Sequence, residues 1–175
     1  MIKKIAVGTL VIIAIIFGLA LTKPDTFAVQ RVVTIKAPPE KIAPLISDFH
    51  NWGSWSPWEA LDPKMQRTFS GAAAGKGAVY AWKGNKDVGQ GRMEITDETP
   101  PAKVVIKLDF LEPFASHNVT EFTLKPQGDS TIVTWNMTGP MPLISKIMSV
   151  FASMDKMIGP DFEKGLAKMK TVAEK

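Results

Sequence analysis

The chain has 175 residues, of which 45% are hydrophobic, and this length suits one domain with a short additional segment. It contains no cysteine, which excludes disulfides, zinc–thiolate sites and cysteine nucleophiles. Its only two histidines, His50 and His117, also exclude a histidine-rich metal site.

The net charge of +4 comes from the N-terminal segment. Of the 21 basic residues, Lys3, Lys4 and Lys23 flank an apolar run, so 18 remain against 17 acidic residues. Proteins that bind nucleic acid usually carry a concentrated basic stripe. We therefore expect no nucleic-acid partner.

Residues 1–23 read MIKKIAVGTLVIIAIIFGLALTK, without a charged residue from Ile5 to Leu21. As a helix this run is about 25 Å long, close to the lower limit for a bilayer span. We predict that residues 1–23 are a membrane anchor that is kept in the mature protein. The alternative is a cleaved signal peptide, because Gly18 and Ala20 form a small-x-small pattern.

Both interpretations leave the two N-terminal lysines in the cytoplasm. The first predicts a single-pass inner-membrane protein whose domain is periplasmic or extracellular. The second predicts a secreted or periplasmic protein.

After a short linker at residues 24–26, FAVQRVVTIKA predicts a strand. Phe27, Val29, Val33 and Ile35 share one face, and Arg31 is a charged exception on that face. The following PPEKIAPLISDF predicts a helix, which Pro44 should keep short or bent.

The segment NWGSWSPWEALDP, residues 51–63, holds three of the five tryptophans. Trp52, Trp55 and Trp58 recur every third residue, so they can share one side of a turn. We interpret them mainly as a core plug at one end of a sheet, which could also form a cavity floor. Direct ligand contact, membrane-surface anchoring and sugar stacking are the alternatives, in that order.

Six short segments from residue 65 onward predict antiparallel strands separated by turn residues. Alternation is clearest in two of them, AKVVIKLDFLEP and STIVTWNMTG. Between the first two, GAAAGKG lacks the spacing of a phosphate loop and is interpreted as a hairpin. Gly84-Asn85 and Gly128-Asp129 are candidate tight turns, and Gly89 and Gly91 should allow strong bending.

The last 35 residues change to a helical period, with an apolar stripe from Leu143 to Met169. This predicts one long helix, kinked or broken at Gly159-Pro160. The helix is the element available to cover the sheet. The predicted fold is therefore α+β, with a curved antiparallel sheet wrapped around a C-terminal helix and an apolar space between them.

Five segments of the sequence carry a family resemblance, namely APPEKI, DFHNWGSWSPWEALDP, GKGAVYAWKGNKDVGQGRMEI, TIVTWNMTGP and MIGPDFEKGLAKMK. Together they resemble the SRPBCC superfamily. It is also called START-like or Bet v 1-like, and includes sequences labelled polyketide cyclase/dehydrase and lipid transport. The resemblance covers residues 27–175 and is strongest to a bacterial, often membrane-anchored branch. It implies a helix-grip fold around a deep hydrophobic cavity, and it does not imply catalysis.

Alternation and the helical stripe predict which side chains form the cavity wall. On the sheet these are Trp82, Met93, Ile106, Phe110, Phe122, Trp135 and Met137, and on the helix Met154, Ile158 and Phe162. Trp55 is added as a possible floor. The methionines of the C-terminal segment suggest an adaptable wall.

Polar candidates are few. Arg31 is the inward-facing exception on its strand, and Arg92, Asn118 and Thr120 are expected near the cavity mouth. The acidic residues Glu94, Asp109 and Glu121 are expected on the outer face. Neither histidine lies in a nucleophile-elbow pattern. We therefore predict no catalytic residue, no metal and no cofactor.

The leading hypothesis is a membrane-anchored protein that holds an apolar small molecule or lipid. The second is a cyclase- or hydrolase-type enzyme that uses cavity acids and a bound water. The third is a structural or envelope-stress interaction protein with a collapsed cavity. The sequence does not identify the ligand or the oligomeric state.

Overall fold

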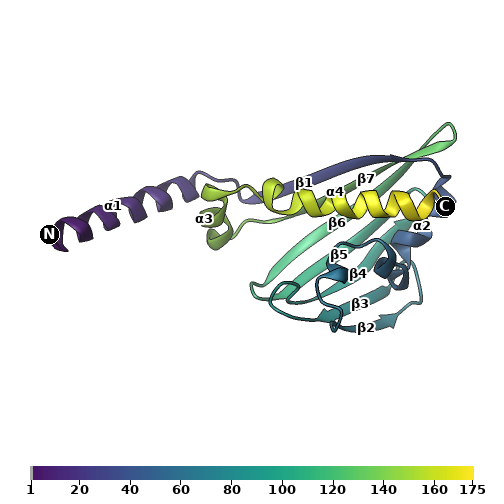
Figure 1. Cartoon of the computed structure of the whole chain (residues 1–175), viewed down its shortest axis with the longest axis horizontal. Helices are drawn as coiled ribbons and strands as arrows, with labels where there is room; N and C mark the ends of the chain where they lie inside the picture. Colours follow the sequence, from purple (N-terminus) through teal and green to yellow (C-terminus); the bar gives the residue numbers. More distant parts are fainter. Residues whose placement is uncertain (1) are drawn as a thin grey trace.

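A computed structural model describes residues 2–175 as a curved sheet with one long helix along it and a second helix that extends away (Figure 1). The helices are α1 (Ile2–Leu21), α2 (Pro39–Ser47), α3 (Leu143–Phe151) and α4 (Met154–Ala173), with 3₁₀ turns η1 (Phe49–Ser54) and η2 (Trp58–Ala60). The strands are β1 (Thr26–Ile35), β2 (Gln66–Gly71), β3 (Ala78–Lys83), β4 (Gln90–Thr99), β5 (Lys103–Glu112), β6 (Ser116–Gln127) and β7 (Ser130–Pro140).

The seven strands form one antiparallel sheet in the order β1-β7-β6-β5-β4-β3-β2. All six strands expected after residue 65 are confirmed, and GAAAGKG connects β2 to β3 as a hairpin. Gly128 and Asp129 form the two-residue turn between β6 and β7, where Gly128 has a φ of +62°. The pairing of β4 with β5 shifts between Gln90 and Gly91, at the glycines expected to allow bending.

The tryptophan-rich segment closes one part of the concave face. Its spacing of three residues matches the period of a 3₁₀ helix, and Trp52 lies within η1. Trp52 Nε1 donates to the Ile46 carbonyl at 3.0 Å, and Trp55 Nε1 donates to the Leu45 carbonyl at 2.7 Å. Both rings are buried with their polar atoms paired, so these two tryptophans are core residues, as expected.

The C-terminal segment differs from the prediction of one helix broken at Gly159-Pro160. The break lies at Ala152 and Ser153, where Ala152 is extended and the Ser153 hydroxyl accepts from Lys156 N at 3.3 Å. This N-cap starts a new helix, whereas Pro160 is exposed and lies inside α4. The sequence interpretation gave the proline too much weight and overlooked the serine cap.

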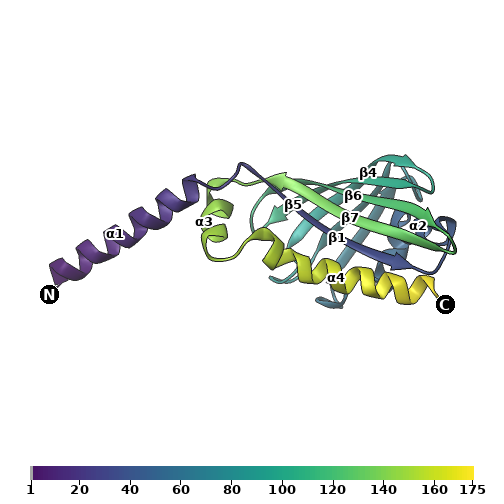
Figure 2. The same cartoon turned by 90° about the horizontal axis from the view of Figure 1, so that it is seen from above.

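Helix α4 lies along β1 (Figure 2). The Arg31 side chain holds it there. Arg31 Nη1 bonds Asp155 Oδ1 and Arg31 Nε bonds Glu163 Oε1, each at 2.7 Å. A side chain at Gly159 would collide with this guanidinium. Arg31 therefore faces the sheet side that was predicted, but it pairs with helix carboxylates and does not line the cavity.

The helix-grip fold expected from the sequence is confirmed. The concave face of the sheet and α4 share one core, in which Ile35, Ile95, Val133 and Met169 are fully or almost fully buried. Helix α1 lies outside this core and extends from the same end of the domain as α3 (Figures 1 and 2).

Candidate functional site

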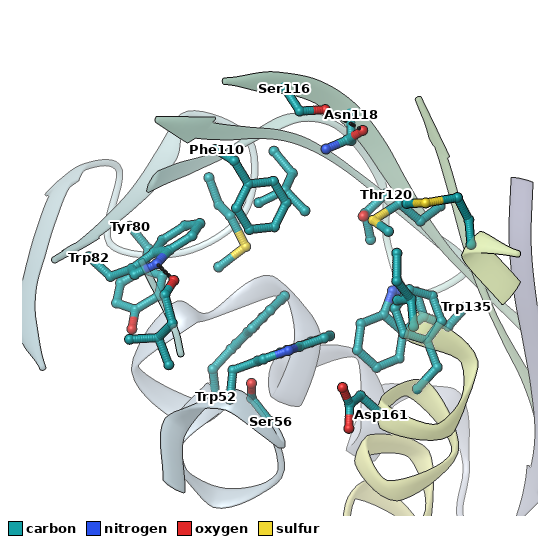
Figure 3. Close-up of a pocket in the computed structure, with 18 of the residues that line it drawn as sticks. Trp52, Ser56, Tyr80, Trp82, Phe110, Ser116, Asn118, Thr120, Trp135 and Asp161 are labelled. Atoms are coloured by element: carbon teal, nitrogen blue, oxygen red, sulfur yellow. Dashed lines mark hydrogen bonds between the residues drawn. The ribbon is translucent and has the colours of Figure 1, made fainter. Parts of the chain in front are cut away.

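A cavity of about 310 Å³ lies between the concave face of the sheet, the tryptophan-rich segment and the first half of α4 (Figure 3). Its volume is near the lower end of the range for small-molecule sites. Aromatic, methionine and aliphatic side chains make up most of the wall. Such a wall suits an apolar guest.

Eight of the eleven predicted cavity residues lie on this wall. They are Trp82, Met93, Phe110, Trp135, Met137, Met154, Ile158 and Phe162. Helix α4 and strands β3, β4, β5 and β7 bring them together from positions far apart in the chain. Alternation therefore assigned the correct face to each of these strand residues.

The other three, Trp55, Ile106 and Phe122, are fully buried but do not line the cavity. The Trp55 ring is surrounded by other rings, with centroids of Trp52 at 4.8 Å, Trp135 at 5.5 Å and Phe122 at 6.1 Å. These neighbours fill the space that a ligand would need. Trp55 is therefore part of the plug, and Trp52 and Trp58 line the cavity in its place.

Sequence reasoning missed several wall residues. Leu108 and Tyr80 follow the alternation of Phe110 and Trp82, so the same pattern could have identified them. Val88 lies in the loop between β3 and β4, and no periodicity could place it. Its carbonyl accepts the Trp82 indole N–H at 3.0 Å, which fixes that ring on the wall.

A stack of aromatic rings joins α4 to the sheet at the cavity. The Phe162 and Trp135 rings are nearly parallel, at 10°, with centroids 4.0 Å apart. The Phe122 ring also stacks on Trp135, with centroids 4.8 Å apart. Trp58 meets Trp135 edge to face at 5.8 Å. Within the described residues, the buried Nε1 of Trp135 is a side-chain donor with no acceptor.

One strip of the wall is polar. Ser116, Asn118 and Thr120 alternate along β6, and all three line the cavity (Figure 3). The Ser116 hydroxyl donates to Asn118 Oδ1 at 3.2 Å. The same oxygen packs against Gly139, so a side chain at position 139 would collide with it. This orientation points the Asn118 amide nitrogen into the cavity (Figure 3).

Asn118 and Thr120 thus lie where the sequence placed them, but Arg92 does not. Alternation with Met93 turns Arg92 to the outer face, where Arg92 Nη2 pairs with Glu94 Oε2 at 2.8 Å. The expectation of Arg92 near the mouth was wrong.

Glu59 is the most buried of the three acidic residues that border the cavity. Its Oε1 accepts from the Tyr80 hydroxyl at 2.6 Å, and its Oε2 accepts from Arg67 Nε at 2.7 Å. Burial, with the hydrogen bond to Glu59, raises the pKa of the Tyr80 hydroxyl, so Tyr80 stays protonated at neutral pH. Both oxygens of Glu59 therefore already have partners.

The acidic residues expected on the outer face are found there in ion pairs. Glu121 pairs with Lys103 at 2.8 Å. Asp109 is more enclosed: burial favours its neutral form, but hydrogen bonds from His117 and Lys107 outweigh burial and lower its pKa. These contacts account for Asp109 as a structural group.

Among residues 2–175, no three histidine, aspartate or glutamate side chains come close enough together to hold a metal ion. Two further carboxylates border the cavity, Asp87 and Asp161, and Asp161 is bonded to Lys164 at 3.0 Å.

Comparison with known proteins assigns the fold to a family. Residues 26–174 match the family described as polyketide cyclase / dehydrase and lipid transport. The chain belongs to this family. It is therefore a member of the SRPBCC superfamily, as the sequence resemblance indicated. A comparison with curated protein sequences gives no match.

Solved structures share the fold at low sequence identity. A protein from Chromobacterium violaceum is 14% identical with a TM-score of 0.59, over 87% of this chain and 99% of that one. A protein from Mesorhizobium loti is 20% identical with a TM-score of 0.57, over 84% and 95%. The di-domain ARO/CYC protein BexL of the BE-7585A biosynthetic pathway is 14% identical with a TM-score of 0.61, over 90% and 53%.

Proposed function

We propose that this protein binds a small apolar molecule, or one acyl chain of a lipid, in the cavity while α1 anchors it to a membrane. The observation that carries the binding proposal is the 310 Å³ space, which is enclosed mainly by aromatic and aliphatic side chains. A collapsed core would have filled this space, as close packing normally does. The family description, which includes lipid transport, also supports the proposal.

The anchor proposal is supported by α1. Within α1, the 18 residues Lys4–Leu21 have a mean hydropathy of 2.5, and few of them are buried by the domain. Their exposed leucine, isoleucine and valine side chains would be costly in water over this length. Lys3 and Lys4, at the N-terminal end of the apolar run, favour a cytoplasmic N-terminus and a domain on the other side, in the periplasm or outside the cell.

The polar strip on β6 suggests that the ligand is not a pure hydrocarbon. The Asn118 amide nitrogen is a donor directed into a mostly apolar cavity. A donor that a bound ligand covers without offering an acceptor is unfavourable. We infer that the ligand carries one acceptor, such as a hydroxyl or carbonyl oxygen, that meets Asn118.

The binding proposal predicts that the detergent-solubilised full chain saturates with a fluorescent fatty-acid analogue, and that Phe110→Asp abolishes this binding. The new carboxylate would point into the apolar cavity and would have to be desolvated when the analogue binds. The matched control is Val119→Asp, on the exposed outer face of β6, which should bind like the wild type. Equal binding by wild type and Phe110→Asp, or no saturable binding by the wild type, would reject the cavity as the site.

A second prediction tests the polar contact. Asn118→Leu should weaken binding of a long-chain alcohol by roughly 2- to 10-fold, the value of one hydrogen bond. The same variant should bind an alkane of equal chain length at least as well as the wild type does. Competition against the fluorescent analogue measures both affinities. If both ligands change in parallel, Asn118 acts through cavity shape and not through a hydrogen bond.

The enzyme hypothesis has one supporting feature, the Tyr80–Glu59–Arg67 group at the wall. General acid–base catalysis needs a group that is free to exchange a proton with the substrate. Here the Tyr80 proton is directed to Glu59, and Arg67 holds the same carboxylate. We therefore favour binding, and chemical conversion of a bound ligand that is lost in Glu59→Gln would favour the enzyme instead.

A further inference from the structure

Helix α3 exposes an unusually apolar face for its length. Leu143, Ile144, Met148 and Phe151 are all exposed, Phe151 to 73%, and no residue of the helix is buried. Their spacing places them on neighbouring positions of the helix surface. A contiguous apolar patch of this kind usually marks an interaction site.

The position of α3 relative to α1 is fixed by short-range contacts. The two helices pack together, and only residues 22–25 separate the end of α1 from β1. Asp25 in this connection accepts from Met141 N at 2.7 Å and pairs with Lys146 Nζ of α3 at 2.6 Å. Helix α3 therefore stays beside the domain end of α1, as Figures 1 and 2 show from two directions.

The cavity reaches the same end of the domain. Pro140 at the end of β7, Ser145 of α3 and Ser116 at the start of β6 all line it. The end of β5 and the loop between β5 and β6 also lie at this end, and each exposes one more apolar side chain, Leu111 in β5 and Phe114 in the loop. The exposed apolar residues of α3 and of this loop therefore lie on the end of the domain to which the cavity extends.

We propose that α3 and the β5–β6 loop rest in the surface layer of the bilayer, so that the cavity takes its ligand from lipid and not from water. This inference rests on the proposed anchoring by α1. Anchoring places the domain end of α1 at the membrane surface, and α3 is held beside it. An amphipathic helix in that position buries its apolar face at the boundary between headgroups and acyl chains.

A lipid surface fits this patch better than a second copy of the chain. The patch includes residues from a helix and from a separate loop, and both lie at the end of the domain from which the proposed membrane-spanning helix extends. A bilayer can contact all of these residues together, because an anchor of this length fixes the domain within a few residues of the headgroups.

The test uses the full chain in phosphatidylcholine vesicles and exploits the lack of cysteine. A single cysteine replaces Phe151 or Phe114 and carries an environment-sensitive NBD fluorophore, and quenching by spin-labelled lipid is measured. Both probes should show blue-shifted emission and strong quenching. The matched control is Val32→Cys on β1, where a residue that is 53% exposed lies away from this end and should give no quenching.

Flotation of the vesicles separates the two proposals. A chain that does not float with vesicles contradicts the α1 anchor. A chain that floats, but whose Phe151 probe is quenched no more than the Val32 probe, overturns the surface contact and leaves the anchor standing. Energy transfer between Phe151 probes on different chains, without lipid quenching, also overturns it and assigns the patch to a second copy.

Discussion

Trp55→Ala is expected to lower the free energy of unfolding by about 3–5 kcal/mol, as removal of a large buried aromatic side chain usually does. The Trp55 side chain is fully buried and is enclosed by the rings of Trp52, Phe122 and Trp135. The substitution also removes the hydrogen bond to the Leu45 carbonyl. Several core contacts and one buried hydrogen bond are therefore lost together.

Urea denaturation of the detergent-solubilised full chain, followed by circular dichroism, measures this effect. Trp55→Phe keeps a ring and loses the indole N–H, so it should cost less than Trp55→Ala. Trp58→Ala is the second control, because Trp58 is only partly buried and borders the cavity. An unchanged midpoint for Trp55→Ala would show that the plug does not stabilise the domain.

The fold could be predicted from the sequence because each signal was local. Strict alternation identified strands such as β5, and glycine pairs marked turns such as Gly128-Asp129. The helix boundary near residue 152 was missed because an apolar stripe runs across it without a change of period. Ser153 gave the signal, but a single capping serine is a weak feature beside a Gly-Pro pair.

The site could be predicted only in part, because periodicity gives the face of a strand and not the position along it. Ile106 and Phe110 share one face of β5, but Ile106 is in the filled core and Phe110 is on the cavity wall. What separates them is the location of the tryptophan-rich segment and of α2, which depends on tertiary packing. The same limit explains why Trp55 was included and Trp52 was not.

The exposed face of α3 shows a related limit. The apolar stripe from Leu143 to Met169 predicted burial of the whole segment against the sheet, but only the α4 part is buried. Leu143 and Phe151 are exposed. An amphipathic pattern indicates that a face needs an apolar partner, and it does not say whether that partner is a sheet or a membrane.

Phe162→Ala is also expected to destabilise the domain by about 3–5 kcal/mol, because it removes a buried ring that stacks on Trp135 at 4.0 Å. Its effect on binding should differ from that of Trp55→Ala. Phe162 borders the cavity, so the space it leaves joins the existing 310 Å³. The space left by Trp55 lies behind other side chains and is not part of the cavity wall.

A bulky pyrene-labelled fatty acid should therefore bind more tightly to Phe162→Ala than to the wild type and restore part of its lost stability. Ligand at 100 times its Kd stabilises the protein that binds it by about 2.7 kcal/mol, which is large enough to detect in the same urea titration. The ligand should stabilise Trp55→Ala against urea by no more than it stabilises the wild type. Equal recovery by the two variants would contradict the boundary drawn between plug and cavity, since that boundary predicts that only the space left by Phe162 can accept a ligand.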